Sequence, residues 1–198
     1  DSFGNIRSST SPAGLFVDTK APLPTVNTLA ARTDKPTLTG TLGDPSPSSG
    51  MNTLSVTVGG SSYVPTVSGN AWTLIMPAAL ADGTYDVVVR MTDNAGNTGT
   101  DASTNELRID TTAPAVVYSA IVSKEAASLL TASASDDNGV SRLSFTVGSQ
   151  TFAAALNGAN WTGRVPTALG DGSYDVTITA EDSFGNIRSS TSPAGLFV

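Results

Sequence analysis

Residues 82–91 read DGTYDVVVRM, and residues 171–180 read DGSYDVTITA, 89 positions further along the chain. In both stretches, apolar residues occupy every second position from the tyrosine onwards. This period of two places those residues on one face of a β-strand, because successive side chains of a strand point to opposite sides. Each stretch is therefore predicted to be a strand that faces a hydrophobic core.

The same alternation recurs at short intervals on either side of this strand. Residues 54–58 place Leu, Val and Val at alternate positions, and residues 143–147 place Leu, Phe and Val there. Further strand signals lie at residues 38–42, 72–76 and 107–109. About seven strands in about 90 residues are typical of an immunoglobulin-like sandwich. The predicted fold class is all-β: two tandem immunoglobulin-like β-sandwiches of about seven strands each, plus a terminal strand from a preceding repeat. No long α-helix is expected.

The tyrosine of each stretch resembles a tyrosine corner, in which the hydroxyl of a tyrosine near the start of a strand bonds to nearby backbone. Val87 follows Tyr85 at the position where many immunoglobulin domains place a cysteine, and the second stretch repeats this. The chain contains no cysteine, so aromatic and aliphatic packing alone must close the cores. Trp72 and Trp161 are expected in those cores, and a binding platform is the alternative role for either.

The two ends of the sequence carry the strongest repeat. Residues 1–17, DSFGNIRSSTSPAGLFV, return letter for letter as residues 182–198. Seventeen consecutive identities indicate duplication of a unit of 181 residues. Residues 1–17 are therefore interpreted as the F–G turn and strand G of a preceding repeat. An orphan strand exposes unpaired backbone groups, so we expect these residues to be extended and paired with a sheet edge.

A looser repeat divides the 181-residue unit in two. Residues 18–22, DTKAP, return as residues 110–114, DTTAP, after 92 positions, whereas the tyrosine stretches are 89 positions apart. The three-residue difference falls in the loop at residues 44–50, where an insertion is tolerated by a shared fold. The sequence therefore predicts two homologous domains, at residues 18–109 and 110–198.

Composition excludes several classes of function. Seventeen acidic residues face ten basic ones, giving a net charge of −7 that would repel a phosphate backbone, so no nucleic-acid partner is expected. The sequence has no apolar run long enough for a membrane span, so no membrane insertion is expected. It also lacks histidine, the commonest general base. We therefore expect no enzymatic activity.

The aspartates are candidate metal ligands because of where the topology places them. In an immunoglobulin-like domain the incoming linker, the B–C loop and the F–G turn meet at one pole, and the E–F corner lies at the other. Carboxylates that converge there repel one another unless a cation is bound, and Ca²⁺ prefers six to eight oxygen ligands. The alternative is that these aspartates only cap turns. The predicted calcium ligands are Asp18, Asp44 and Asp93 in the first domain, Asp110, Asp136, Asp137 and Asp182 in the second, and Asp82 at the first E–F corner, facing the next linker.

Three segments carry a resemblance to a known family: residues 93–97, DNAGN; residues 110–114, DTTAP; and residues 169–176, LGDGSYDV. They resemble bacterial Ig-like tandem repeats of giant surface adhesins of the RTX and biofilm type, over essentially the whole chain. The resemblance implies extender domains at the extracellular bacterial surface, with neighbouring repeats of the same chain and calcium ions as partners and with calcium stiffening the joints. Residues 126–130, AASLL, depart from the pattern set by residues 35–38, KPTL.

Two functional hypotheses follow. The first is a structural extender that projects a ligand-binding region located elsewhere in the full protein. The second is an Ig-like binding module that recognises a glycan or a protein, which would need an exposed aromatic or flat surface. The sequence offers no clustered aromatic residues for that role. The extender is therefore favoured, and a glycan-binding or cell-binding assay distinguishes the two hypotheses.

Overall fold

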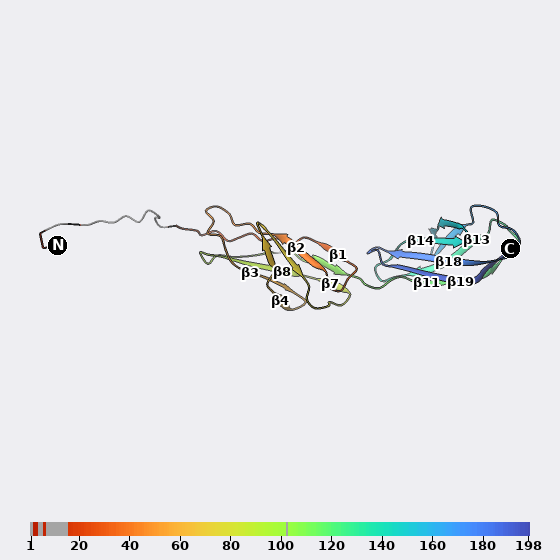
Figure 1. The fold of residues 1–198 in the computed structure, drawn as a ribbon, viewed down its shortest axis with the longest axis horizontal. Helices are drawn as coiled ribbons and strands as arrows, with labels where there is room; N and C mark the ends of the chain where they lie inside the picture. Colours follow the sequence, from red (N-terminus) through yellow and green to blue (C-terminus); the bar gives the residue numbers. More distant parts are fainter. Residues whose placement is uncertain (1, 4–5, 7–15, 102) are drawn as a thin grey trace. The chain divides into compact units, whose positions relative to one another are not determined.

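The computed structural model describes residues 2–3, 6, 16–101 and 103–198, and the chain divides into two compact units. The first unit contains Asp1–Thr28, Thr37–Met76 and Tyr85–Glu106, and the second contains Leu29–Pro36, Pro77–Thr84 and Leu107–Val198. The described residues form strands and no helix (Figure 1). The predicted all-β fold is therefore confirmed. None of the described residues belongs to a helix that could span a membrane.

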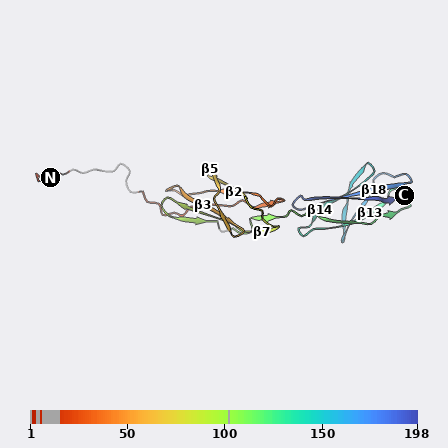
Figure 2. The same ribbon diagram turned by 60° about the horizontal axis from the view of Figure 1, so that its bottom comes forward.

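The first unit contains two antiparallel sheets. One has the strand order β2-β6-β5 and the other the order β4-β3-β8-β9; β2, β3 and β5 are labelled in Figure 2. Their bounds are β2 Thr37–Thr41, β3 Met51–Val58, β4 Ser61–Tyr63, β5 Thr66–Ser68, β6 Ala71–Ile75, β8 Val87–Asp93 and β9 Thr98–Thr100.

The alternation in the sequence explains which face of each strand is buried in the first unit. Val56 and Val58 of β3 and Val87 and Val89 of β8 are all buried, as the period of two predicts. Trp72 of β6 is 1% exposed, which confirms its place in the core. Its indole N–H donates to the carbonyl oxygen of Thr25 at 2.9 Å, and Gly40 of β2 lies against the same atoms.

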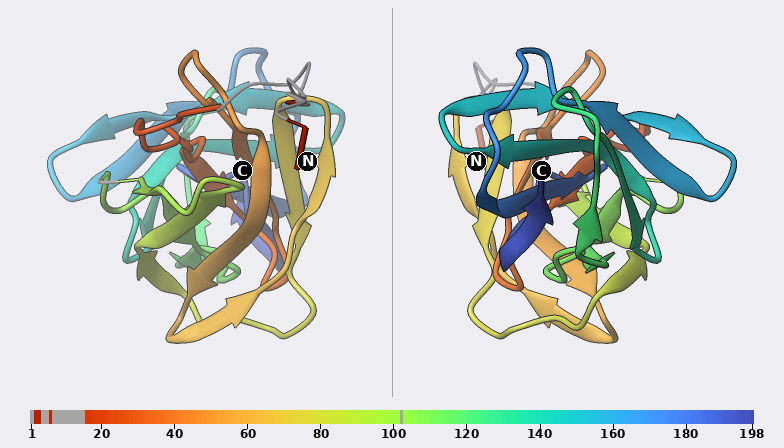
Figure 3. Two further views of the ribbon diagram at one scale, coloured as in Figure 1. Left: turned by 90° about the vertical axis from the view of Figure 1, so that its left-hand side faces the viewer. Right: turned by 90° about the vertical axis from the view of Figure 1, so that its right-hand side faces the viewer.

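The second unit contains three sheets. A small sheet has the order β1-β10-β7, in which β1 and β10 run parallel. The other two have the orders β11-β13-β17-β16 and β12-β19-β18-β14-β15. Figure 3 gives two further views of the strands. Their bounds are β1 Leu29–Ala31, β7 Gly83–Tyr85, β10 Leu107–Ile109, β11 Ala115–Tyr118, β12 Ile121–Val122, β13 Leu129–Ser135, β14 Val140–Val147, β15 Gln150–Ala153, β16 Ala155–Asn157, β17 Asn160–Arg164, β18 Ser173–Asp182 and β19 Ile187–Phe197.

An aromatic group fills the core between the two larger sheets. Phe145 of β14 is fully buried, and its ring centroid lies 6.3 Å from that of Tyr118 and 5.9 Å from that of Phe152. Trp161 of β17 is 8% exposed and belongs to the same core, as predicted. The binding-platform alternative for the two tryptophans is therefore wrong. The hydroxyl of Tyr174 donates to the carbonyl oxygen of Gly170 at 3.0 Å, which is the bond of a tyrosine corner.

The predicted pairing of residues 1–17 lies largely outside the described residues and stays a prediction. Residues 187–197 of β19, the identical copy of residues 6–16, pair with β18 in an antiparallel register. That register shifts between Tyr174 and Val176, opposite Pro193. The shift agrees with the preference of proline for edges and bulges.

Candidate metal centres

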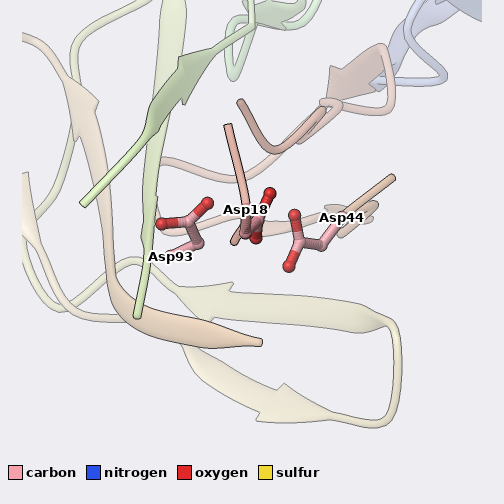
Figure 4. Close-up of side chains that lie close together, drawn as sticks. All are labelled: Asp18, Asp44 and Asp93. Carbon is pink, nitrogen blue, oxygen red and sulfur yellow. The ribbon is translucent and has the colours of Figure 1, made fainter. Parts of the chain in front are cut away.

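Three carboxylates of the first unit come together. One oxygen from each of Asp18, Asp44 and Asp93 lies within 4.8 Å of the others (Figure 4). Asp18 begins the segment that leads into the first sheets, Asp44 lies in the loop between β2 and β3, and Asp93 ends β8. We call this group the first carboxylate cluster. It joins the linker, B–C loop and F–G turn of the sequence prediction.

Asn97 organises two members of the first carboxylate cluster. Asp93 is fully buried, and its two oxygens accept the backbone N–H and the side-chain N–H of Asn97, both at 2.8 Å. The same side-chain amide also donates to the backbone carbonyl of Asp18 at 3.1 Å. The Asp18 carboxylate accepts the N–H groups of Lys20 and Ser49. The N–H of Lys20 is the main reason that the pKa of Asp18 lies below its ordinary value, against the opposing effect of burial.

Asp44 completes the first carboxylate cluster and is incompletely satisfied. Its Oδ2 accepts the hydroxyl of Ser48 and the N–H of Gly50. Its Oδ1 is buried and has no hydrogen-bond partner among the described residues. A buried carboxylate oxygen without a partner is costly, particularly beside two further carboxylates. A cation would compensate this cost, so the donor set fits a bound metal.

The second unit contains an equivalent group, the second carboxylate cluster, formed by Asp110, Asp136 and Asp182. One oxygen from each again lies within 4.8 Å of the others. Asp182 is 1% exposed, and its oxygens accept the backbone N–H of Asn186 at 2.9 Å and the side-chain N–H of Asn186 at 2.8 Å. The side-chain amide of Asn186 also donates to the backbone carbonyl of Asp110 at 2.9 Å. The two clusters therefore share one aspartate–asparagine frame.

The third carboxylate of the second cluster, that of Asp136, has different surroundings from Asp44 in the first cluster. Asn138 donates its side-chain N–H to Asp110 and its backbone N–H to Asp136, both at 2.8 Å. Burial raises the pKa of Asp136, and the negative charges of Asp110, Asp182 and Asp137 raise it further. Burial also opposes the ionisation of Asp182, but its hydrogen bonds from Asn186 and the following turn prevail and lower its pKa. Burial and the neighbouring negative charges thus disfavour the ionised form of Asp136 in the absence of a cation.

Asp82 and Asp137 lie outside both clusters. Asp82 accepts the N–H and the hydroxyl of Thr111 at 3.0 and 2.9 Å, and the hydroxyl of Thr112 at 3.0 Å. The N–H of Thr111 contributes most to lowering the pKa of Asp82. Asp137 is exposed and borders a polar hollow together with Asp82, Asp110 and Asp136. The structure thus gathers six of the eight predicted residues and leaves these two at the periphery.

Sequence reasoning missed the asparagines. Asn97 and Asn186 each bond to two aspartates of a cluster, and Asn138 does the same from the neighbouring loop. The signal was present, because both F–G turns read Asp-x-x-Gly-Asn. The central glycines of these turns have positive φ, 92° at Gly96 and 89° at Gly185, which lets the turn close on its own aspartate.

Every candidate ligand atom in the two clusters is a carboxylate oxygen. Such a hard, anionic donor set suits Ca²⁺ or Mg²⁺ rather than zinc or copper, which prefer nitrogen and sulfur. Calcium tolerates irregular geometry and completes its shell with backbone carbonyls or water, whereas Mg²⁺ demands a near-ideal octahedron. The residues present therefore fit calcium, and its binding stays a prediction.

A protein-family model agrees with this architecture. The sequence model of the bacterial Ig-like domain family matches residues 29–111 and 124–197. Among solved structures, the fibronectin(III)-like modules of Clostridium thermocellum CbhA are 15% identical, with a TM-score of 0.48, and the match covers 89% of this chain and 94% of that one. A tetra-tandem repeat in the extending region of a large adhesion protein is 22% identical, with a TM-score of 0.39 and coverage of 86% and 48%. Murine CEACAM1b is 11% identical, with a TM-score of 0.43 and coverage of 89% and 100%. No curated protein matches the sequence.

Proposed function

The chain belongs to the family of bacterial Ig-like domains, and from this premise we propose that it is a non-catalytic extender segment of a large bacterial cell-surface adhesin. In this proposal the segment is extracellular and projects a ligand-binding region that lies elsewhere in the protein. Calcium bound at the two carboxylate clusters stiffens the points where one repeat passes into the next.

The position of Asp110 is the observation that carries the proposal. Asp110 directly follows the last residue of β10, Ile109, and it is 2% exposed. Its carboxylate belongs to the second cluster, and its backbone carbonyl accepts the Asn186 amide. The residue at the predicted domain boundary is thus held by the B–C loop and by the F–G turn of the following domain. A cation at this cluster would fix the path of the chain at that boundary.

Asp18 has the same relation to the first cluster. It is the first residue of the first predicted domain, as Asp110 is of the second. Its backbone carbonyl accepts the side-chain amide of Asn97, as that of Asp110 accepts the side-chain amide of Asn186. A ligand placed at each boundary of a tandem array suits a protein whose function depends on stiffness. A binding module would not need one at every boundary.

Calcium titration by isothermal calorimetry, followed by thermal melting and small-angle scattering with and without chelator, tests the proposal. We expect two sites per chain and a larger, more variable set of conformations after chelation. Asp171→Asn is the matched control, because Asp171 is an exposed aspartate at the second E–F corner and belongs to neither cluster. Unchanged melting and scattering on chelation would show that calcium has no structural role and that the aspartates only form turns.

A further inference from the structure

Asparagine is followed directly by glycine at two places in the sequence, Asn138–Gly139 and Asn157–Gly158. Such a pair is prone to spontaneous deamidation, because glycine has no side chain to keep its backbone nitrogen away from the neighbouring amide. Both pairs lie in the second domain, and residues 18–109 contain none. The two pairs share one chemistry in different surroundings, so each serves as a control for the other.

The pair Asn157–Gly158 lies open to solvent. It forms the turn between β16 and β17, in which Asn157 is the register partner of Asn160, and both of its residues are exposed. Among the described residues, none forms a hydrogen bond with the side-chain amide of Asn157. The groups that react in deamidation are therefore accessible to each other and to water at this pair.

The pair Asn138–Gly139 is held by the second carboxylate cluster. The half-buried Asn138 donates its side-chain N–H to Asp110 and its backbone N–H to the carboxylate of Asp136, both at 2.8 Å. Its backbone carbonyl accepts the hydroxyl of Ser183 at 2.9 Å. The N–H of Gly139 donates to the backbone carbonyl of Asp136 at 3.1 Å. The amide and the nitrogen that react in deamidation are thus both engaged in other hydrogen bonds.

Deamidation of this pair takes place in two steps. The backbone nitrogen of Gly139 attacks the side-chain carbonyl carbon of Asn138, a C–N bond forms, and the amide leaves as ammonia together with the proton of that nitrogen. Water then opens the resulting succinimide ring at either of its carbonyl carbons, which gives aspartate or isoaspartate. The first step requires the Gly139 N–H to leave the carbonyl of Asp136 and the Asn138 amide to leave Asp110.

We propose that Asn138–Gly139 is a site of spontaneous deamidation whose rate is controlled by the second carboxylate cluster. The reaction is slow while the hydrogen bonds to Asp110 and Asp136 are intact, and it proceeds when this loop opens. Either product replaces a neutral donor to Asp110 by a further carboxylate, and like charges at this distance repel one another. Deamidation therefore destabilises the second cluster in the absence of a cation. The first cluster has no asparagine–glycine pair and lacks this site.

The test incubates the full chain at neutral pH in chelator and follows both pairs by peptide mapping with mass spectrometry. In the wild type, Asn138 should react about tenfold more slowly than Asn157, which is the effect of one hydrogen bond to a charged acceptor. Asp110→Ala removes that acceptor and should accelerate the reaction of Asn138 about tenfold, with Asn157 unchanged. Ser183→Ala removes a neutral hydrogen bond and should accelerate it about threefold. If Asp110→Ala accelerates both pairs, that variant has lost its fold, and Ser183→Ala decides.

Equal rates at the two pairs in the wild type, or a rate at Asn138 that neither variant changes, would overturn the control by the cluster. No product at Asn138 in either variant would overturn the site itself. Asn138→Asp reproduces one product and should lower the melting temperature of the second domain in chelator by about 4–8 °C, whereas Asn157→Asp should leave it unchanged. An unchanged melting temperature in Asn138→Asp would overturn the effect on the cluster. None of these outcomes depends on calcium, so each leaves the extender proposal intact.

Discussion

The two carboxylate clusters share a frame and differ in their third carboxylate. In both, a buried aspartate at the end of a strand accepts hydrogen bonds from the asparagine of the same turn, and that asparagine bonds to the residue at the domain boundary. In the first cluster the longer B–C loop supplies Asp44 with donors from Ser48 and Gly50. In the second, the carboxylate of Asp136 accepts one backbone N–H from the described residues and lies near other carboxylates. The frame thus stabilises the turn by itself, and we expect a bound cation to act mainly on the third carboxylate.

Breaking the frame should have the largest effect. Asp182→Ala leaves the backbone N–H groups of Phe184 and Asn186 and the Asn186 amide without their acceptor in a buried place. We expect a loss of about 3–5 kcal/mol of unfolding free energy, with or without calcium. Urea unfolding in chelator measures it. Asp182→Asn, which keeps one acceptor oxygen, should lose about half as much. If Asp182→Ala lowered the free energy of unfolding only in the presence of calcium, the aspartate would stabilise the fold through the bound ion and not through these hydrogen bonds.

Removing calcium should have the next largest effect. Extracellular calcium sites have dissociation constants of about 10⁻⁴–10⁻³ M. About 10 mM calcium then adds about 1.4–2.7 kcal/mol per site. Chelation should therefore lower the melting temperature by about 5–20 °C. Asp110→Ala should abolish this response at the second cluster and leave the response of the first cluster in place, which differential scanning calorimetry can resolve. Equal melting with and without chelator would contradict the prediction.

Replacing Asp136 should raise the melting temperature in the absence of calcium, and this direction of change should distinguish the second cluster from the first. Its raised pKa means that the folded protein holds the Asp136 proton more tightly than the unfolded chain. The resulting stability is present below the unfolded pKa and is lost as the pH rises through the folded pKa. At neutral pH without calcium, Asp136→Asn should therefore raise the melting temperature by about 2–4 °C, while removing the calcium response of that cluster.

Asp44→Asn is the matched comparison for Asp136→Asn. The hydroxyl of Ser48 and the N–H of Gly50 both already donate to Oδ2 of Asp44. An amide oxygen in the place of Oδ2 keeps both hydrogen bonds but weakens them, because they are no longer assisted by a charge. We expect no gain in melting temperature in chelator. Melting of both variants between pH 4 and pH 8 checks the contrast, and a gain of equal size in both would show that the two loops do not differ.

The fold could be predicted because its determinants are local and periodic. The alternation at residues 54–58 and 143–147 named core residues that are all buried, since a strand offers only two faces. One buried charge was not foreseen. Glu106 is 2% exposed, and its Oε2 accepts the N–H of Val87 at 2.9 Å, whereas the second domain has Gly195 at the equivalent position. Whether a side chain such as that of Glu106 can accept a backbone N–H of a strand depends on the exact path of the backbone. The alternation of apolar and polar residues does not encode this path.

For the carboxylate clusters, the sequence could predict which loops meet but not which side chains of those loops come together. Strand order brings a linker, a loop and a turn to one pole, and this was enough to group Asp18, Asp44 and Asp93. It was not enough to choose between Asp136 and Asp137, because neighbouring residues of a turn point in different directions. The roles of the asparagines likewise depend on the closure of each turn around its positive-φ glycine, a detail that residue spacing alone does not specify.

The smallest effect on calcium affinity is expected for the replacement of Asp137. It tests the difference between a carboxylate that binds the ion and one that only lies near it. Asp137 is exposed and contributes no oxygen to the second cluster, but its charge helps to raise the pKa of Asp136. Asp137→Asn should therefore weaken calcium binding only through the long-range field, by about twofold at low salt. The difference should shrink above about 0.15 M salt, where the Debye length is about 8 Å. Calorimetric titration at two salt concentrations, with Asp171→Asn as control, measures this effect. A loss of tenfold or more that persists in high salt would make Asp137 a direct ligand, because salt does not screen a direct contact between a carboxylate oxygen and the ion.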